Sequence, residues 1–268
     1  MTATDSVFAG SIPALYDRHL VPLLFVPYAR DMAHRAAALS PRQILETAAG
    51  TGVVTEALAE AVPQAEIVAT DLNQAMIDVA AARIGSPRIS FRQADAQSLP
   101  FDDASFDAVV CQFGVMFFPD RIAAYREARR VLRPGGRFLF NVWNRIEDNP
   151  VSRILAEAVA ELFPDNPPSF LNRVPFGYHD KARIEGDLRA AGFQEIAAET
   201  VGQSSRIGSA RAAAIGLCHG SPLRAEIEEH GPAALDQATE AAAAALSRLA
   251  GADGVEAPMS AHVFGARA

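Results

Sequence analysis

The segment Ile44–Gly52, with the sequence ILETAAGTG, constrains the fold of this chain more than any other stretch. A short apolar run ends at an acid, Glu46, and leads into a turn of small residues that contains Gly50 and Gly52. A helical segment follows, and the next apolar run ends at a second acid, Asp71. Glycines let the backbone approach a ligand, a helix N-terminus favours negative charge, and an acid after the second strand suits ribose hydroxyls. The pattern predicts a β-α-β unit that binds a nucleotide.

The spacing of the glycines argues against a dinucleotide site. A pyrophosphate-binding turn reads G-x-G-x-x-G, with Gly or Ala at the last position. Counted from Gly50, that position holds Thr55. The turn therefore predicts a nucleotide ligand without a pyrophosphate.

The turn resembles the first motif of the class I S-adenosylmethionine (SAM)-dependent methyltransferases, which reads acid-x-G-x-G-x-G. Glu46, Ala48, Gly50 and Gly52 occupy the four defined positions, and Ala48 departs from the motif because a glycine is expected there. A residue with a Cβ atom disfavours positive φ, so we expect the turn to sit slightly differently while still binding the cofactor.

The segments that follow resemble the same family in the same order. Asp71 closes the second strand, and Asn73 is placed to cap the next helix. The third strand ends at Asp95, whose equivalent in the family lies beside the adenine amino group. A fourth strand, FDAVVCQ, a helix and the turn LRPGG then lead to a fifth strand, RFLFNVW. These matches cover residues 42–143.

The resemblance implies the fold class and the domain organisation. We expect an α/β, Rossmann-like mixed sheet of seven strands with helices on both faces, its last strand antiparallel between the fifth and sixth. Residues 1–42 are predicted to form a helical N-terminal cap, and residues 43–268 the methyltransferase domain. Within that domain, the proline-rich segment 144–180 is predicted to be a lid and residues 209–250 a helical insertion.

The resemblance also implies the cofactor, SAM, and its product, S-adenosylhomocysteine. The residues expected to bind it follow the first four strands: Glu46, Ala48, Gly50, Thr51, Gly52, Asp71, Leu72, Met76, Asp95, Ala96 and Gln112.

The acceptor side of the reaction is less defined by the sequence. Methyl transfer from a sulfonium depends mainly on proximity, and it needs a base only when the acceptor must lose a proton. The family accordingly has no universal catalytic residue. The candidates for such a base are His179, Tyr178 and His219, since histidine titrates in the useful pH range. The candidates for the acceptor pocket are mostly aromatic: Tyr16, Phe25, Phe117, Trp143, Phe176 and Tyr178.

Composition excludes several kinds of protein. The formal net charge is −8 and no basic run occurs, which argues against a nucleic-acid partner. Two cysteines and six scattered histidines offer no metal-ligand spacing, so no metal is expected. The N-terminus lacks a basic, apolar leader, and no stretch is long and apolar enough to span a membrane. We expect a cytoplasmic protein with a small-molecule acceptor and no stable membrane insertion; the oligomeric state stays open.

Three functions remain open from the sequence. The first is an enzyme that methylates an O, N or C atom of a small, largely apolar or aromatic acceptor, because the segments LPFDDASFDAVVC and LRPGG resemble the quinone-biosynthesis and natural-product branch. The second is a lipid or polyprenyl-quinone methyltransferase. The third, from another class, is a SAM-binding regulatory protein without transferase activity. A nicotinamide oxidoreductase is a minor fourth.

Overall fold

The computed structural model describes residues 5–251 and 254–268, and they divide into two compact units. The sheet unit comprises residues 28–143, 178–201 and 261–268. The helical unit comprises, so far as it is described, residues 5–27, 144–177, 202–251 and 254–260. The boundaries predicted from the sequence, 1–42 and 43–268, stay a prediction.

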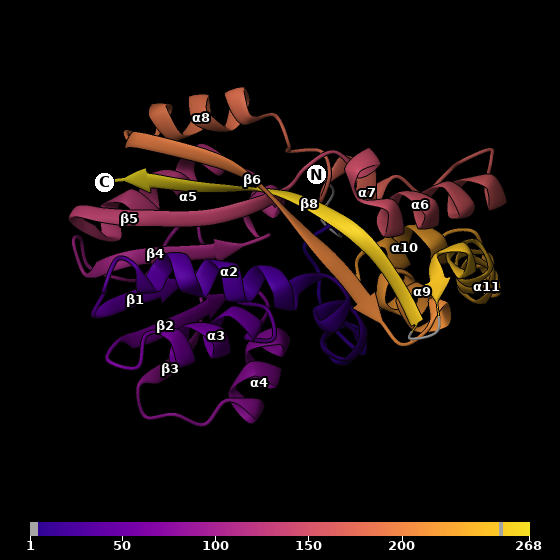
Figure 1. Cartoon of the computed structure of the whole chain (residues 1–268), viewed down its shortest axis with the longest axis horizontal. Helices are drawn as coiled ribbons and strands as arrows, with labels where there is room; N and C mark the ends of the chain where they lie inside the picture. The colour runs from indigo at the N-terminus through magenta and orange to yellow at the C-terminus, as the bar shows by residue number, and fades with distance from the viewer. Residues whose placement is uncertain (1–4, 252–253) are drawn as a thin grey trace. The chain divides into compact units, whose positions relative to one another are not determined.

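The described residues form one eight-stranded sheet in the order β3-β2-β1-β4-β5-β8-β6, with the short β7 beside β8 (Figure 1). Strands β1 to β5 pair in parallel, and β8 pairs with β5 antiparallel. The expected seven-stranded mixed sheet is therefore confirmed, and β7 is an addition of two residues. The strands are β1 (Gln43–Glu46), β2 (Glu66–Asp71), β3 (Ile89–Gln93), β4 (Phe106–Gln112), β5 (Leu132–Trp143), β6 (Gln194–Ile207), β7 (Ala250–Gly251) and β8 (Gly254–Arg267).

Helices alternate with the parallel strands of the sheet unit and also make up most of the helical unit. Those associated with the sheet unit are α2 (Val26–Ala37), α3 (Val53–Ala61), α4 (Gln74–Arg83), η2 (Val115–Phe117), α5 (Arg121–Val131) and α8 (Lys181–Ala190). Those of the helical unit are α1 (Ile12–Leu15), η1 (Tyr16–Phe25), η3 (Ile146–Asp148), α6 (Pro150–Leu162), α7 (Phe170–Arg173), α9 (Ala210–His219), α10 (Leu223–Glu228), α11 (Ala234–Leu246) and η4 (Ser247–Leu249).

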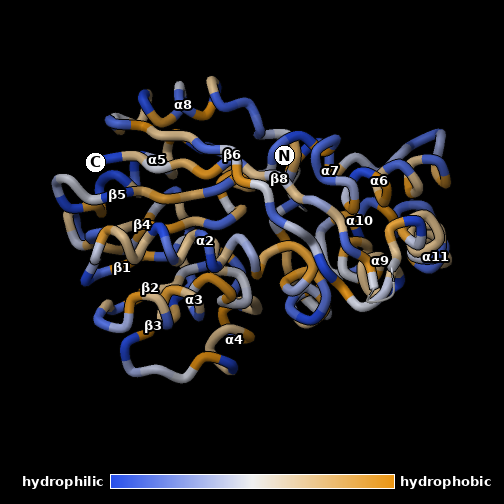
Figure 2. The backbone as a smooth tube through the Cα atoms, in the orientation of Figure 1, coloured by the Kyte–Doolittle hydropathy of each residue, from blue (hydrophilic) through white to orange (hydrophobic). Residues whose placement is uncertain are grey.

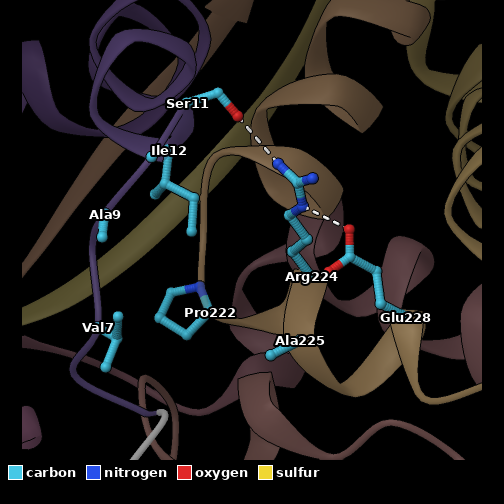
Figure 3. Close-up of a pocket in the computed structure, with 9 residues that line it drawn as sticks. Val7, Ala9, Ser11, Ile12, Pro222, Arg224, Ala225 and Glu228 are labelled. Carbon is cyan, nitrogen blue, oxygen red and sulfur yellow. Dashed lines mark hydrogen bonds and ion pairs between the residues drawn. The ribbon is translucent and has the colours of Figure 1, made fainter.

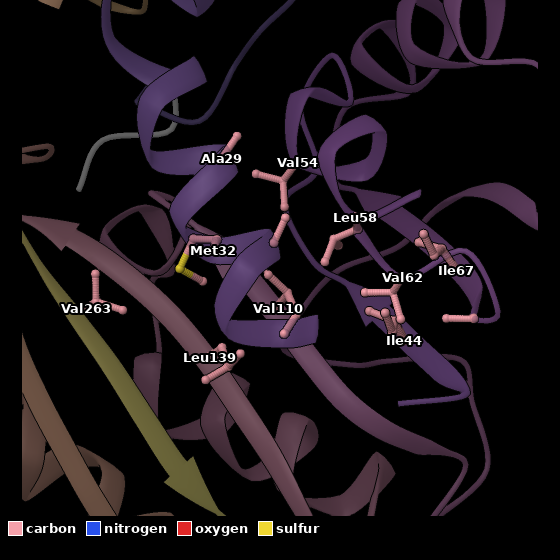
Figure 4. Close-up of a cluster of buried hydrophobic side chains, with 13 residues drawn as sticks. Ala29, Met32, Ile44, Val54, Leu58, Val62, Ile67, Val110, Leu139 and Val263 are labelled. Carbon is pink, nitrogen blue, oxygen red and sulfur yellow. The ribbon is translucent and has the colours of Figure 1, made fainter. Parts of the chain in front are cut away.

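One face of the sheet is covered by α2 and α3. Met32 of α2 and Leu58 of α3 are fully buried against Ile44, Val110 and Leu139 of three neighbouring strands (Figure 4). These strands bury both faces, which is why their sequences are nearly continuous apolar runs (Figure 2).

The opposite face of the sheet carries aromatic side chains. Phe140 of β5 stacks on Phe264 of β8 with ring centroids 5.0 Å apart, and Tyr125 of α5 lies 5.5 Å from Phe140. All three are fully buried. Helices therefore cover both faces of the sheet, as the sequence predicted.

Side-chain caps fix several helix starts. Asp120, Asp180 and Ser209 each accept a hydrogen bond from a backbone N–H in the first turn of α5, α8 and α9, as N-cap residues do. The predicted cap at Asn73 is wrong in detail. Asn73 is the N-cap residue of α4, but its side chain makes no cap bond, and its amide instead points to Asp71.

The segment Tyr16–Phe25 forms a π-helix, η1, that contains Pro22. The helix packs on α9 of the same unit, where two glycines four residues apart permit close approach. A Cβ atom on Gly216 would lie 3.0 Å from His19 Cβ, and one on Gly220 would lie 3.0 Å from the Tyr16 nitrogen.

Gly216→Val is therefore expected to destabilise the protein by about 1–3 kcal/mol, because branched carbons would be forced against the backbone of η1. Urea unfolding of both proteins measures the difference. Gly186→Val on α8 is the control, since a Cβ atom at Gly186 meets nothing within 4 Å. Equal losses for both variants would show that the contact with η1 has no special cost.

The predicted insertion 209–250 contains three α-helices, since Gly220–Pro222 and Gly231–Pro232 separate α9, α10 and α11. One further expectation needs correction. The segment LRPGG is not a turn outside the fifth strand. It belongs to β5, where Gly135 takes a φ of +83° and the register against β4 shifts.

Candidate active site

The small-residue turn after β1 is fixed by its neighbours in the sheet. Thr47 N–H donates to the Val110 carbonyl of β4 at 2.9 Å, and Ala49 N–H donates to the Thr70 carbonyl of β2 at 2.9 Å. The turn thus lies at the carboxyl edge of three parallel strands, where open α/β sheets bind ligands.

Ala48 adopts the conformation of the glycine that it replaces. Its φ is +52°, a left-handed value that disfavours a side chain. The expected shift of the turn is therefore not needed to accommodate Ala48, and the backbone takes the glycine-like conformation instead. The room for its methyl group comes from Gly114, since a Cβ atom there would lie 2.5 Å from Ala48 Cβ.

The rest of the turn has the features of a ligand cradle. Gly50 and Gly52 have φ values of +58° and +84°. Thr51 is buried, and its hydroxyl oxygen has no hydrogen-bond partner among the described residues. A buried polar atom is normally paired, so Thr51 fits a site that a polar ligand completes. The turn therefore fits the predicted cofactor.

Glu46, at the end of β1, is fully buried and accepts a hydrogen bond from the Thr55 hydroxyl at 2.6 Å. Burial, with a smaller contribution from the nearby Asp71 carboxylate, raises the pKa of its carboxyl from 4.5 to about 8, against the hydrogen bond from Thr55. At neutral pH the ligand-free protein therefore holds Glu46 protonated.

The stability of the ligand-free protein should fall between pH 5 and pH 9. A group whose folded pKa is raised stabilises the fold fully below its unfolded pKa, and that contribution is lost as the pH rises through about 8. Glu46→Gln keeps an acceptor for Thr55 and cannot ionise. We expect it to be more stable than the wild type by several kcal/mol at pH 9 and little different at pH 5.

Urea unfolding at both pH values measures this effect, with Glu60→Gln, an exposed change on α3, as the matched control. A Glu46→Gln protein that keeps the wild-type pH dependence would contradict the account of Glu46.

Asp71, the acid at the end of β2, faces the turn. One carboxylate oxygen accepts from Gly50 N–H at 2.9 Å, and the other accepts from Asn73 N–H at 2.8 Å. Burial raises the pKa of Asp71, and these hydrogen bonds oppose the rise. The structure thus joins the two acids and the glycines that the sequence predicted as one site.

The remaining predicted cofactor residues lie after β2, β3 and β4. Met76 is buried in α4, whereas Leu72 is 49% exposed although it is a large hydrophobic residue. Asp95 is exposed and accepts from Gln97 N–H at 2.8 Å. Ala96 follows Asp95, and Gln112 ends β4. Their roles in binding stay predictions.

Three of the predicted acceptor residues, and His179, lie in the sheet unit. Trp143 ends β5 and is buried, and Phe117 ends the short helix η2. Tyr178 is buried between α5 and α8. Its hydroxyl donates to the Asp187 carboxylate at 2.7 Å, and the Arg121 guanidinium lies 4.3 Å from its ring centre. These contacts give Tyr178 a structural role, and a role in catalysis stays a prediction.

The helical unit holds the other candidates. Tyr16 and Phe25, both in η1, stack with ring centroids 5.2 Å apart, so two predicted pocket residues do lie together. Phe176 is buried. His219, at the end of α9, contacts Thr239 Oγ1 through Nε2 at 2.8 Å.

The tautomer of His219 follows from its partner. The Thr239 hydroxyl donates to the Leu235 carbonyl at 2.7 Å, so His219 Nε2–H is the donor between the two side chains. The lone pair of the neutral ring then lies on Nδ1. Burial lowers the pKa of His219, and the positive charge of Arg224 lowers it further, which favours the neutral ring.

A hollow of about 310 Å³ lies in the helical unit, apart from every residue that the sequence singled out (Figure 3). Apolar side chains of the N-terminal segment and of α10 line it, among them Val7, Ile12 and Ala225. Arg224 lies in its wall, where it binds Ser11 and Glu228. We assign it no ligand.

Sequence reasoning missed two residues at the carboxyl edge of the sheet. The Tyr28 hydroxyl donates to the Val201 carbonyl at 3.1 Å, and its ring contacts Trp143. Asn141 is fully buried in β5. Asn141 could have been identified from the sequence, because an amide side chain within the apolar run RFLFNVW needs a hydrogen-bond partner.

Within residues 5–251 and 254–268, no helix is long and apolar enough to cross a membrane. In the same part of the chain, no cluster of three His, Cys, Asp or Glu side chains suits a metal ion.

Comparison with known proteins agrees with the fold. A family model described as a methyltransferase domain matches residues 45–140. Demethylmenaquinone methyltransferase of Deinococcus radiodurans is 44% identical over 141 residues, which are 51% of this chain and 58% of that protein. The ubiquinone/menaquinone biosynthesis C-methyltransferase UbiE of Caulobacter vibrioides is 32% identical over 182 residues, 60% of this chain and 72% of that protein. The chain thus spans less than two thirds of the first relative's length.

A solved structure resembles most of this chain. Phosphoethanolamine N-methyltransferase 2 of Haemonchus contortus, in complex with phosphomonomethylethanolamine and S-adenosylhomocysteine, has a TM-score of 0.59 at 16% identity. The match covers 96% of this chain and 56% of that one, and it supports the fold alone. The chain belongs to the class I SAM-dependent methyltransferases, in the branch that includes the demethylmenaquinone and ubiquinone/menaquinone biosynthesis methyltransferases.

Proposed function

We propose that this protein is a SAM-dependent methyltransferase that methylates a ring carbon of a reduced quinone. The observation that carries the proposal is the likeness to quinone-biosynthesis methyltransferases. The match to the methyltransferase-domain model, over residues 45–140, contains the turn after β1 and the acid at the end of β2. This acceptor is the polyprenyl-quinone alternative left open by the sequence, and it also fits the broader class of apolar, aromatic acceptors.

The residues after β1 and β2 suit the cofactor. When bound, SAM supplies an electrophilic methyl group with its own leaving group. Gly50 and Gly52 let the backbone approach the ligand, and Thr51 offers an unsatisfied hydroxyl. Asp71 offers a carboxylate for the ribose hydroxyls, provided that its bonds to Gly50 and Asn73 rearrange or are shared.

A reduced quinone suits the absence of a universal catalytic base. The hydroxyl groups of a hydroquinone ring push electron density onto the ring carbons, so the ring carbon attacks once it is held in line. A proton must leave the ring carbon afterwards. The candidates to accept it stay the three that the sequence offered, His179, Tyr178 and His219.

An assay of several acceptors tests the proposed function. Reduced and oxidised naphthoquinone, a phenol and an aromatic amine are each incubated with SAM, and the methylated product is located by NMR. We expect methylation at a ring carbon of the reduced naphthoquinone, with no product from its oxidised form. Transfer only to the phenol oxygen or to the amine nitrogen would contradict the proposed acceptor. No transfer at all, with SAM bound, would favour the regulatory alternative.

A further inference from the structure

The carboxyl ends of β4 and β5 carry a closely packed aromatic cluster. Trp143, the one tryptophan of the chain, stacks on Phe113 with ring centroids 3.9 Å apart and an interplanar angle of 10°. Tyr28 lies edge-on to both rings, at 5.2 Å from Phe113 and 5.6 Å from Trp143. The fluorescence of Trp143 therefore reports on this cluster.

Phe113 reaches the stack through an unusual backbone conformation. Its φ is +51°, which a bulky residue seldom adopts and which must be held by its surroundings. What holds it is Asn141 of β5. Phe113 N–H donates to Asn141 Oδ1 at 2.8 Å, and more weakly to the Asn141 carbonyl at 3.3 Å.

Asn141 has a second polar atom with no assigned role. The residue is fully buried, and its Nδ2 atom has no hydrogen-bond partner among the described residues. The amide cannot be turned around, because Nδ2 would then face the Phe113 N–H, donor against donor. Leaving a buried hydrogen-bond donor unpaired costs free energy. The Nδ2 atom of Asn141 therefore favours a bound ligand with an atom that accepts a hydrogen bond.

The position of Asn141 in the sheet also points to a ligand. It pairs with Gln112, the last residue of β4, at the carboxyl edge where open α/β sheets bind ligands. Because side chains alternate along a strand, Asn141 and Trp143 lie on the same face of β5. Asn141 is thus paired across the sheet with the predicted cofactor residue Gln112 and shares a face of β5 with the predicted acceptor residue Trp143.

We propose that Asn141 is a ligand-positioning residue, whose Oδ1 holds Phe113 and whose Nδ2 donates to an oxygen atom of a bound small molecule. That oxygen belongs either to the carboxylate of the cofactor or to the hydroxyl or carbonyl of the acceptor. The inference rests on the proposed function, which supplies these two molecules.

The substitution Asn141→Asp tests the roles of Oδ1 and Nδ2 separately. A carboxyl oxygen still accepts from Phe113 N–H, but an ionised carboxylate has no donor to replace Nδ2. We expect the dissociation constant of one ligand to rise about tenfold at pH 8, and to recover at lower pH as the protonated carboxyl regains a donor. Gln194→Glu, an exposed amide-to-acid change in β6, is the control and should bind both ligands normally.

The measurements distinguish the two sources of the oxygen atom. Titration with S-adenosylhomocysteine tests the cofactor carboxylate, and titration of the S-adenosylhomocysteine complex with reduced naphthoquinone tests the acceptor. The ligand that binds the Asn141→Asp protein more weakly at pH 8 than at lower pH is the one whose oxygen atom accepts from Nδ2. Wild-type affinity for both ligands at every pH in a folded Asn141→Asp protein would overturn the proposal, because Nδ2 would then be left to a buried water.

Trp143 fluorescence tests the proposal on the wild type if the variant does not fold. Saturation with one of the two ligands should change the emission, since that ligand contacts the group that holds Phe113 against Trp143. No change with either ligand overturns the proposal. Failure of the proposed function looks different. Asn141-dependent binding of S-adenosylhomocysteine without methylation of a quinone supports the role of Asn141 and removes only the acceptor.

Discussion

Gly50→Val is expected to abolish SAM binding while the circular dichroism spectrum stays near that of the wild type. The residue takes a φ of +58° in the turn after β1, and its N–H donates to Asp71. A branched side chain disfavours that φ and would also occupy the space that the methionine half of the cofactor needs. Calorimetric titration with S-adenosylhomocysteine measures the loss, which we expect to exceed about a hundredfold.

The control for this substitution is Gly85→Val. Gly85 lies just beyond α4, and a Cβ atom there would meet nothing within 4 Å, so binding should be unchanged. If the Gly50→Val protein is folded and still binds the cofactor, the glycine turn has only a structural role.

Asp71→Ala is expected to weaken SAM binding roughly tenfold to a hundredfold. Hydrogen bonds to a charged group typically contribute about 1.5–3 kcal/mol, and a carboxylate at the end of β2 is placed to accept them from the ribose hydroxyls. Equilibrium titration with S-adenosylhomocysteine gives the change.

The structure adds a complication to this variant. Asp71 also accepts from Gly50 N–H and Asn73 N–H, so its removal loosens the turn as well as the ribose contact. Asp71→Asn keeps one acceptor oxygen, and we expect it to bind more tightly than Asp71→Ala. Cofactor affinity that is unchanged in a folded Asp71→Ala protein would rule out the ribose contact.

Local patterns predicted much of the sheet unit. β4 runs from Phe106 to Gln112 and β2 ends at Asp71, both as the sequence predicts. These elements have sharp boundaries because acids, prolines and turns flank them. The antiparallel position of β8 came from the family resemblance, since no local pattern fixes the order of strands in a sheet.

The features that were missed depend on contacts between distant residues. The left-handed φ of Phe113 is held by Asn141, 28 positions away, and no pattern around Phe113 announces it. The π-helix η1 packs closely against Gly216 of α9 and against Gly220 just after it, both far along the chain. The buried position of Tyr178 likewise depends on partners in α5 and α8.

Calorimetric titration of the wild-type protein with S-adenosylhomocysteine and with NAD tests the central claim most directly. The claim is that the turn after β1 and the carboxylate after β2 hold a SAM-type cofactor. We expect S-adenosylhomocysteine to bind at one site per chain and NAD to give no heat of binding. Binding of NAD without binding of S-adenosylhomocysteine would contradict the account.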